Sequence, residues 1–136
     1  MASTNDDRAG GSAPGPERLF RDHLAQGRLM LQRAKRSGRH FFYPRVAEPG
    51  TGDTDLEWVE ASGAATVYST TVVRRTPERG GDFNIALVDL AEGPRLLSRV
   101  LEIAPDAVRI GMPVSARIDI VDGEHAVVFV PRGGAA

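Results

Sequence analysis

Two groups of basic side chains in this sequence have the chemistry to bind an anion. The first lies in the stretch "RAKRSGRHFFYPRVAEPGTGDTDLEW" (33–58), where cations are interleaved with three consecutive aromatic residues. The second is the pair Arg74 and Arg75. Guanidinium groups bind phosphate and aromatic rings can stack on adenine, so this combination suits a nucleotide. The alternative, which the residues alone favour, is that the rings pack the segment onto the rest of the protein while the cations are solvated.

The other polar residues form no recognisable catalytic pattern. His23, His40 and His125 belong to no ligand motif and to no Ser–His–Asp order, so we expect all three to be structural or exposed to solvent. The carboxylates are scattered, and their spacing does not identify an acid/base pair. The loop "ERGGD" (78–82) lacks the strand–glycine–helix setting of a phosphate loop, although at a barrel rim it could close over a ligand. We therefore predict no catalytic residue.

Composition limits the classes of protein to which the chain can belong. Its 136 residues fit one domain with a single small core. The net charge of -1 argues against broad electrostatic capture of nucleic acid, which normally requires a basic excess. The chain has no cysteine, which excludes disulfides and thiolate metal sites. No stretch has the apolar run of a signal peptide or a membrane span, so we expect a cytoplasmic protein without membrane contact.

The sequence pattern divides the chain into a helix, a small hairpin subdomain and a barrel. Leu19, Phe20, His23 and Leu24 share one helical face, and Gly27 is a stop signal. Short strands are expected at the entry to and exit from the basic stretch. The predicted segments are a disordered tail at 1–16, the helix at 17–28, the hairpin subdomain at 29–60, the barrel at 61–131 and a tail at 132–136.

After residue 63 the pattern is typical of β-strands throughout. Five runs rich in Val, Ile and Thr are separated by turn residues and lie at 64–75, 82–90, 94–103, 113–121 and 125–131. Asp122-Gly123 is a hairpin signal between the last two runs. The rows expected to face inward are Phe83, Ile85 and Leu87, and Val114, Ala116, Ile118 and Ile120. The fold class predicted is mainly β, a five-stranded Greek-key barrel of the OB type preceded by the helix and the hairpin subdomain.

With these elements in place, the order of short motifs resembles a known family. The motifs are "LFRDHLAQGRLMLQR", "GRHFFYPR", "LEWVEASGAATVYSTTVVRR", "NIALVDLAEGPRLLSRV" and "IGMPVSARID", which together cover about residues 17–131. They resemble the OB-fold, acyl-CoA-associated proteins catalogued as domain of unknown function thirty-five. The resemblance implies an N-terminal helix, a rubredoxin-like zinc ribbon and an OB-fold barrel.

The resemblance also implies two Cys-x-x-Cys knuckles on either side of the Phe-x-Pro-Arg centre. On this sequence the knuckle positions fall at Ala34 and Ser37 and near Glu48 and Thr51. A structural zinc needs four Cys or His donors, so we expect a ribbon without zinc and no other cofactor. Losing a metal removes a large folding contribution. We expect the ribbon to be held instead by Trp58, Phe41 and Phe42 against the barrel, or by a partner's surface.

The family resemblance implies a function that composition does not show. Such proteins look like non-catalytic accessory subunits of thiolase-like enzymes, including thiolases, acyltransferases and steroid side-chain aldolases, in hetero-oligomers that can hold acyl-CoA. The residues expected to contact CoA phosphates are Lys35, Arg36, Arg39, Arg74 and Arg75. The residues expected to pack or stack against the partner or ligand are Phe41, Phe42, Tyr43 and Tyr68.

Two other functions stay open at this point. An OB-type barrel could bind single-stranded nucleic acid, which needs a basic groove and stacking aromatic residues. The near-zero net charge and the aromatic content of 6% argue against this alternative. A stand-alone small-molecule enzyme is the other possibility, and the missing catalytic pattern argues against it.

Overall fold

The computed structural model describes residues 4–6, 9–11 and 15–132. Half of the residues in the tail predicted at 1–16, and all but Arg132 in the tail predicted at 132–136, lie outside the described residues. Within the first of them, β1 (Thr4–Asp6) pairs with β2 (Ala9–Gly11) in an antiparallel hairpin. A pair this short depends on backbone hydrogen bonds, for which side-chain composition gives no signal. Among the described residues, none of the helices has the length and apolar character of a membrane span.

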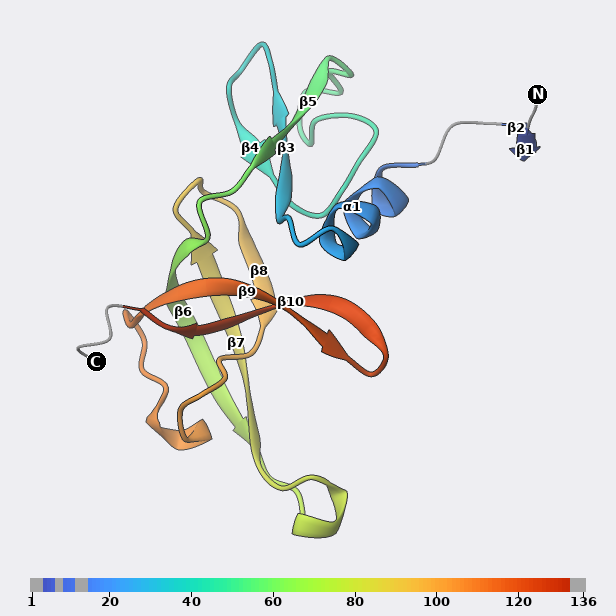
Figure 1. The fold of residues 1–136 in the computed structure, drawn as a ribbon. Helices are drawn as coiled ribbons and strands as arrows, with labels where there is room; N and C mark the ends of the chain where they lie inside the picture. Colours follow the sequence, from blue (N-terminus) through green and yellow to red (C-terminus); the bar gives the residue numbers. More distant parts are fainter. Residues whose placement is uncertain (1–3, 7–8, 12–14, 133–136) are drawn as a thin grey trace.

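The larger part of the molecule is a curled five-stranded antiparallel sheet, and the predicted OB-type fold class is confirmed (Figure 1). The strands follow the order β10-β9-β6-β7-β8. Their bounds are Ala64–Val73 (β6), Phe83–Leu90 (β7), Arg95–Ser98 (β8), Pro113–Val121 (β9) and Glu124–Pro131 (β10). Two 3-10 turns, η1 (Pro77–Arg79) and η2 (Pro105–Ala107), interrupt the connections. The predicted turn between β9 and β10 has both Asp122 and Gly123 at positive φ, as a type I′ hairpin requires.

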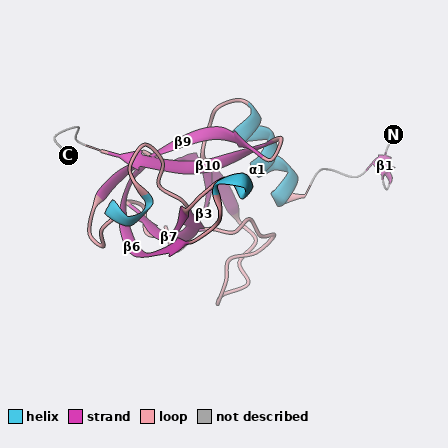
Figure 2. Cartoon of the chain, turned by 90° about the horizontal axis from the view of Figure 1, so that it is seen from below, coloured by secondary structure: helices cyan, strands magenta, loops and turns pink. Residues whose placement is uncertain are grey.

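The sheet closes on itself through one short parallel contact between its edges. Val100 bridges Phe129 there, and Leu101 N donates to Phe129 O at 2.7 Å. The buried Asn84 side chain supports this point, because it donates to Val100 O at 2.8 Å and accepts from Val100 N at 2.9 Å. Seen from below, β9 and β10 lie across one side of the barrel, opposite β6 and β7 (Figure 2).

The expected inward row of β7 is wrong by one residue. The buried side chains of that strand are Asn84, Ala86, Val88 and Leu90, and the expected residues are only partly buried. Since side chains alternate between the two faces of a strand, a shift of one residue exchanges the faces. A polar residue at 84 obscured the pattern, because its burial depends on the hydrogen bonds to Val100. In β9 only Val114 of the expected row is fully buried, and Ile120 is 55% exposed.

The three-stranded sheet above the barrel, with order β4-β3-β5, is hereafter called the ribbon (residues 29–60). Its strands are Met30–Ala34 (β3), His40–Phe41 (β4) and Leu56–Glu60 (β5). Leu31 of β3 is 1% exposed and belongs to the same apolar core as Val88 and Phe129 of the barrel. The base of the ribbon is therefore continuous with the barrel, while its turns point away from it (Figure 1).

Helix α1 (Pro16–Ala25) packs beside both parts of the molecule. It begins at Pro16, whose fixed φ suits the first helical turn, and Gly27 follows it at φ 81°. Phe20 meets Phe42 of the ribbon edge-to-face, with ring centroids 5.2 Å apart. Leu24, which is 4% exposed, supplies the buried apolar contact of the helix. The helix thus fixes the ribbon on the barrel.

Candidate functional site

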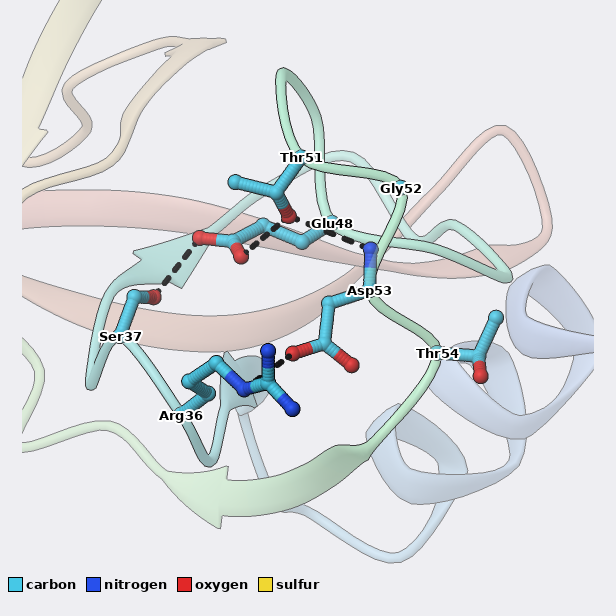
Figure 3. A pocket seen from close by; sticks show the side chains of 7 residues that line it. All are labelled: Arg36, Ser37, Glu48, Thr51, Gly52, Asp53 and Thr54. Carbon is cyan, nitrogen blue, oxygen red and sulfur yellow. Dashed lines mark hydrogen bonds and ion pairs between the residues drawn. The ribbon is translucent and has the colours of Figure 1, made fainter.

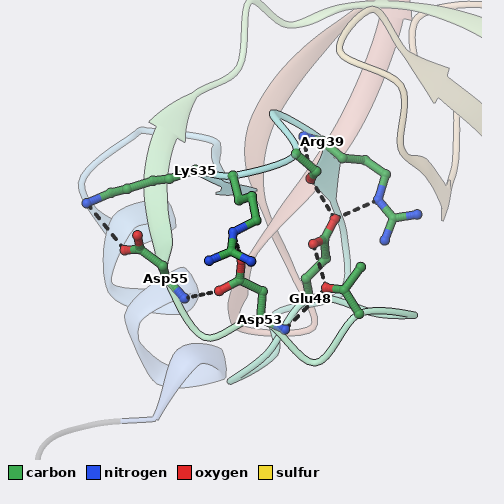
Figure 4. A network of polar contacts seen from close by, with 8 residues as sticks. Lys35, Arg39, Glu48, Asp53 and Asp55 are labelled. Atoms are coloured by element: carbon green, nitrogen blue, oxygen red, sulfur yellow. Dashed lines mark hydrogen bonds and ion pairs between the residues drawn. The ribbon is translucent and has the colours of Figure 1, made fainter.

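The three ribbon residues expected to contact CoA are each paired with a carboxylate, and so is Arg33 (Figure 4). Their partners come from the segment that leads into β5. The pairs are Lys35–Asp55 at 3.6 Å, Arg36–Asp53 at 3.7 Å, Arg39–Glu48 at 2.9 Å and, between β3 and β5, Arg33–Glu57 at 2.5 Å. A guanidinium that already has a carboxylate partner attracts a phosphate less strongly than a free one. The assignment of Lys35, Arg36 and Arg39 to CoA stays a prediction, and this geometry gives it little support.

Glu48 is the centre of this polar network (Figure 3). Its side chain is only 2% exposed, and each of its oxygens accepts hydrogen bonds. Ser37 Oγ and Arg39 Nε donate to Oε2 at 2.8 and 2.9 Å, and Thr51 Oγ1 donates to Oε1 at 2.7 Å. These hydrogen bonds, first those from Thr51 and Ser37, hold the pKa of Glu48 below its ordinary value although its burial acts in the opposite direction. The carboxylate is therefore kept ionised.

The four expected zinc-knuckle positions do not fit a zinc ion. Ala34 is fully buried and has no donor atom, and the hydroxyl groups of Ser37 and Thr51 are not the Cys or His donors of structural zinc. The remaining carboxylate, of Glu48, is already used by three protein donors. Within the described part of the chain, no group of three or more His, Cys, Asp or Glu residues is placed to hold a metal ion.

The aromatic residues of the predicted surface divide into buried and exposed members. Phe41 is 7% exposed and buried, whereas Phe42 is partly buried and contacts the rings of Phe20 and Tyr43. Tyr43 and Tyr68 are 54% and 48% exposed. The ring of Tyr68 is covered by Arg95, whose Cζ atom is 3.3 Å from the ring centroid. Of the four, Tyr43 presents the most open face to a partner or ligand.

At the rim of the barrel the two neighbouring arginines have different environments. Arg74 Nη1 donates to Asp82 Oδ2 at 2.6 Å, which with the Arg75 backbone N–H lowers the pKa of Asp82. The guanidinium of Arg75 instead lies over the ring of Phe83, 4.4 Å from its centroid. Arg99 approaches the same ring at 4.8 Å. We call Arg75, Phe83 and Arg99 the arginine stack.

The arginine stack has the features of an anion site. Neither guanidinium has a carboxylate within ion-pair distance among the described residues. A guanidinium that lies on an aromatic ring keeps its N–H donors in the guanidinium plane, where they can reach a phosphate oxygen. Sequence reasoning missed Phe83 and Arg99, because residue 99 comes near residue 75 only through the pairing of β6 with β7 and of β7 with β8. The single available signal was the position of Arg99 within the strand predicted at 94–103.

Two shallow grooves adjoin each other, and one of them reaches Arg99 of the arginine stack. One, of about 290 Å³, is lined by apolar residues of β7, β8, β9 and β10 and includes Arg99. The other, of about 310 Å³, lies between α1, β8, β10 and residues 42–44. Both are lined by Leu97, Ala126 and Val127, so they form one apolar surface from Tyr43 to Arg99. This surface can accommodate an elongated ligand with an apolar part and an anionic end.

Comparison with known proteins identifies the family. A model of the C-terminal OB-fold domain of ChsH2 matches residues 58–119. A DUF35 domain-containing scaffold protein of Methanocaldococcus jannaschii is 31% identical over 106 residues, which cover 74% of this chain and 75% of that protein. The chain belongs to the DUF35 family. The resemblance to domain of unknown function thirty-five that the motifs suggested is thereby confirmed.

Two further proteins are similar to this DUF35 chain, one a longer relative and one a solved structure. It is 41% identical over 93 residues to a probable enoyl-CoA hydratase alpha subunit of Thermomonospora curvata, covering 65% of this chain but 28% of that protein. The DUF35 chain thus spans less than a third of that relative. A solved structure named Ltp2-ChsH2(DUF35) aldolase superposes with a TM-score of 0.75 at 31% identity, covering 89% of this chain and 98% of the matched one.

Proposed function

We propose that this DUF35 chain is a non-catalytic accessory subunit that associates with a thiolase-like enzyme and helps to hold acyl-CoA in lipid, steroid or related acyl metabolism. The observation that carries the proposal is the similarity, over almost the whole matched chain, to the structure named for Ltp2 together with ChsH2(DUF35). That name couples a DUF35 chain to a second component in an aldolase. The name scaffold protein, borne by the relative from Methanocaldococcus jannaschii, supports the same kind of role.

The apolar surface beside the arginine stack supports acyl-CoA as the ligand class. Acyl-CoA combines phosphates with a long arm and an acyl chain, so it needs cations at one end and apolar contacts along its length. Arg75 and Arg99 supply the cations, while Leu97 and Val127 supply apolar contacts. A relative named as an enoyl-CoA hydratase subunit is consistent with this ligand class.

Co-purification tests the association. The chain is co-expressed with a thiolase-like protein encoded beside it, and we expect one complex to elute with both chains in a fixed ratio. Tyr43→Asp and Leu97→Asp alter exposed residues of the shared apolar surface and are expected to weaken the complex. Ile110→Asp is the matched control, because Ile110 is 72% exposed on the connection between η2 and β9. Separate elution of the two wild-type chains contradicts the proposal.

Two assays on the isolated chain separate the competing functions. Turnover of an acyl-CoA by the isolated chain contradicts a non-catalytic role. Salt-dependent retardation of a short single-stranded oligonucleotide, at concentrations where CoA does not bind, favours the nucleic-acid alternative. We expect neither result.

A further inference from the structure

We infer that Glu48 cross-links the two turns at the end of the ribbon, a structural task that the family resemblance assigns to a zinc ion. One turn spans 34–39 and the other 48–53. Glu48 belongs to the second turn, and its carboxylate accepts hydrogen bonds from Ser37 and Arg39 of the first and from Thr51 of its own. A single ionised side chain therefore joins both turns at one point.

Each turn is closed by its own backbone hydrogen bonds, so the carboxylate connects two preformed units. In the first turn Gly38 N donates to Ala34 O at 2.8 Å. In the second, Gly52 N donates to Glu48 O at 2.9 Å and Glu48 N donates to Asp53 O at 2.8 Å. Both glycines have φ 76°, a conformation that costs glycine little.

Further contacts of the donors extend the link beyond the carboxylate itself. Arg39 also donates through Nη2 to Pro49 O, and its backbone N–H donates to Ser37 Oγ at 3.1 Å. Thr51 Oγ1 accepts from Asp53 N at 3.2 Å. The positive charge of Arg39 balances the carboxylate, and it opposes the entry of a metal cation into the same space.

The aromatic residues do not replace this link. Phe42 packs on Phe20 of α1, and the ring centroid of Trp58 lies 5.6 Å from that of His23 in the same helix. Both contacts are at the base of the ribbon, whereas the turns point away from the barrel (Figure 1). The expectation that aromatic residues hold the metal-free ribbon therefore applies to its base, and Glu48 holds its end.

Replacing the carboxylate tests the inference without removing side-chain volume. In Glu48→Gln we expect amide hydrogen exchange at Gly38 and Gly52 to accelerate about tenfold or more, while barrel amides keep their protection, since the link opens locally. Asp55→Asn is the matched control, because Asp55 is 69% exposed and makes one ion pair with Lys35. Equal exchange at both glycines in the two variants overturns the inference.

Zinc provides the second test. We expect the wild-type chain to purify without zinc and to show the same melting temperature with and without a chelator. One equivalent of zinc with a chelator-sensitive melting temperature overturns the inference. Substitution of all four positions by cysteine (A34C, S37C, E48C and T51C) is expected to give a chain that binds one zinc and protects Gly38 and Gly52. A folded quadruple variant that binds no zinc shows that the turns do not share one centre, and contradicts the inference.

Discussion

In the barrel the least exposed side chains are apolar, whereas at the end of the ribbon the least exposed functional group is a carboxylate. Val88, Val114 and Phe129 have 0% exposure and touch other members of one core. Glu48, which is 3% exposed when the whole residue is counted, touches donors from two turns. Apolar burial is non-directional and is shared among many contacts, while hydrogen bonds to one carboxylate depend on geometry and charge state. The barrel is therefore expected to tolerate change in pH and salt better than the ribbon.

The two groups of arginines differ in whether a carboxylate of the same chain neutralises them. In the ribbon, Arg33, Arg36 and Arg39 are used to neutralise carboxylates within the chain. At the rim, Arg75 and Arg99 share an aromatic ring and have no such partner in the described residues. Basic residues are more numerous in the ribbon, but the cations best able to receive an outside anion are at the rim. The density of charge in the sequence therefore does not show which cations already have a carboxylate partner.

The largest expected effect is the loss of barrel stability on removing Phe129. Phe129→Ala should cost about 3–5 kcal/mol of unfolding free energy, because it leaves a cavity where the barrel closes. The cost should be nearly the same at pH 7 and pH 5, since no charge is removed. Urea unfolding at the two pH values measures it. A cost that depends strongly on pH would remove the distinction between an apolar barrel and an ionic ribbon.

The next effect concerns ligand affinity at the rim. Arg75→Ala and Arg99→Ala should each weaken CoA binding about 10- to 100-fold, the range for a charge-assisted hydrogen bond of roughly 1.5–3 kcal/mol. Arg36→Ala serves as the control from the ribbon. Isothermal titration calorimetry with CoA compares the variants. Equal losses of CoA affinity in Arg36→Ala and Arg75→Ala would mean that ion-paired and ring-stacked arginines contribute equally to CoA binding.

Acid should open the ribbon before the barrel. The pKa of Glu48 is depressed in the folded protein, so its contribution is fully present above the ordinary glutamate pKa of about 4.3 and is lost as the pH falls through the folded pKa. The neighbouring charges are Arg39 and the Arg36–Asp53 pair. Hydrogen exchange at Gly38 and Gly52, corrected for intrinsic rates, should rise below about pH 4. If amides of the ribbon and of the barrel lose protection at the same pH, the expected difference between the two regions is contradicted.

The smallest effect is expected for the exposed ion pair of the ribbon. The Arg36 side chain is 90% exposed and 3.7 Å from Asp53, so Arg36→Ala should shift the melting temperature by less than about 2 °C. Differential scanning calorimetry detects a shift of that size. A fall as large as that in Glu48→Gln would show that the ribbon depends on its whole charge network and not on the buried carboxylate.

Much of the fold could be predicted from local patterns. The runs from Ala64 onward alternate and end at turn residues, and Asp122-Gly123 identifies its hairpin, because these signals come from residues close together in the chain. The predicted inward face of β7 was wrong, because the burial of Asn84 depends on its hydrogen bonds to Val100, sixteen residues away. The candidate site was predicted only in part, as Arg75 without Phe83 and Arg99.

By itself, the sequence determined the fold class, the absence of thiolate ligands and the family resemblance, because these depend on residue type, order and spacing. Only the tertiary structure decided which charges are already neutralised. Ser37, Glu48 and Thr51 lie in two turns that the strands of the ribbon bring together, and Arg75 and Arg99 meet through the barrel. The residue type gives the charge of a side chain. Its ion-pair partner depends on distances between segments, and local sequence patterns do not determine those distances.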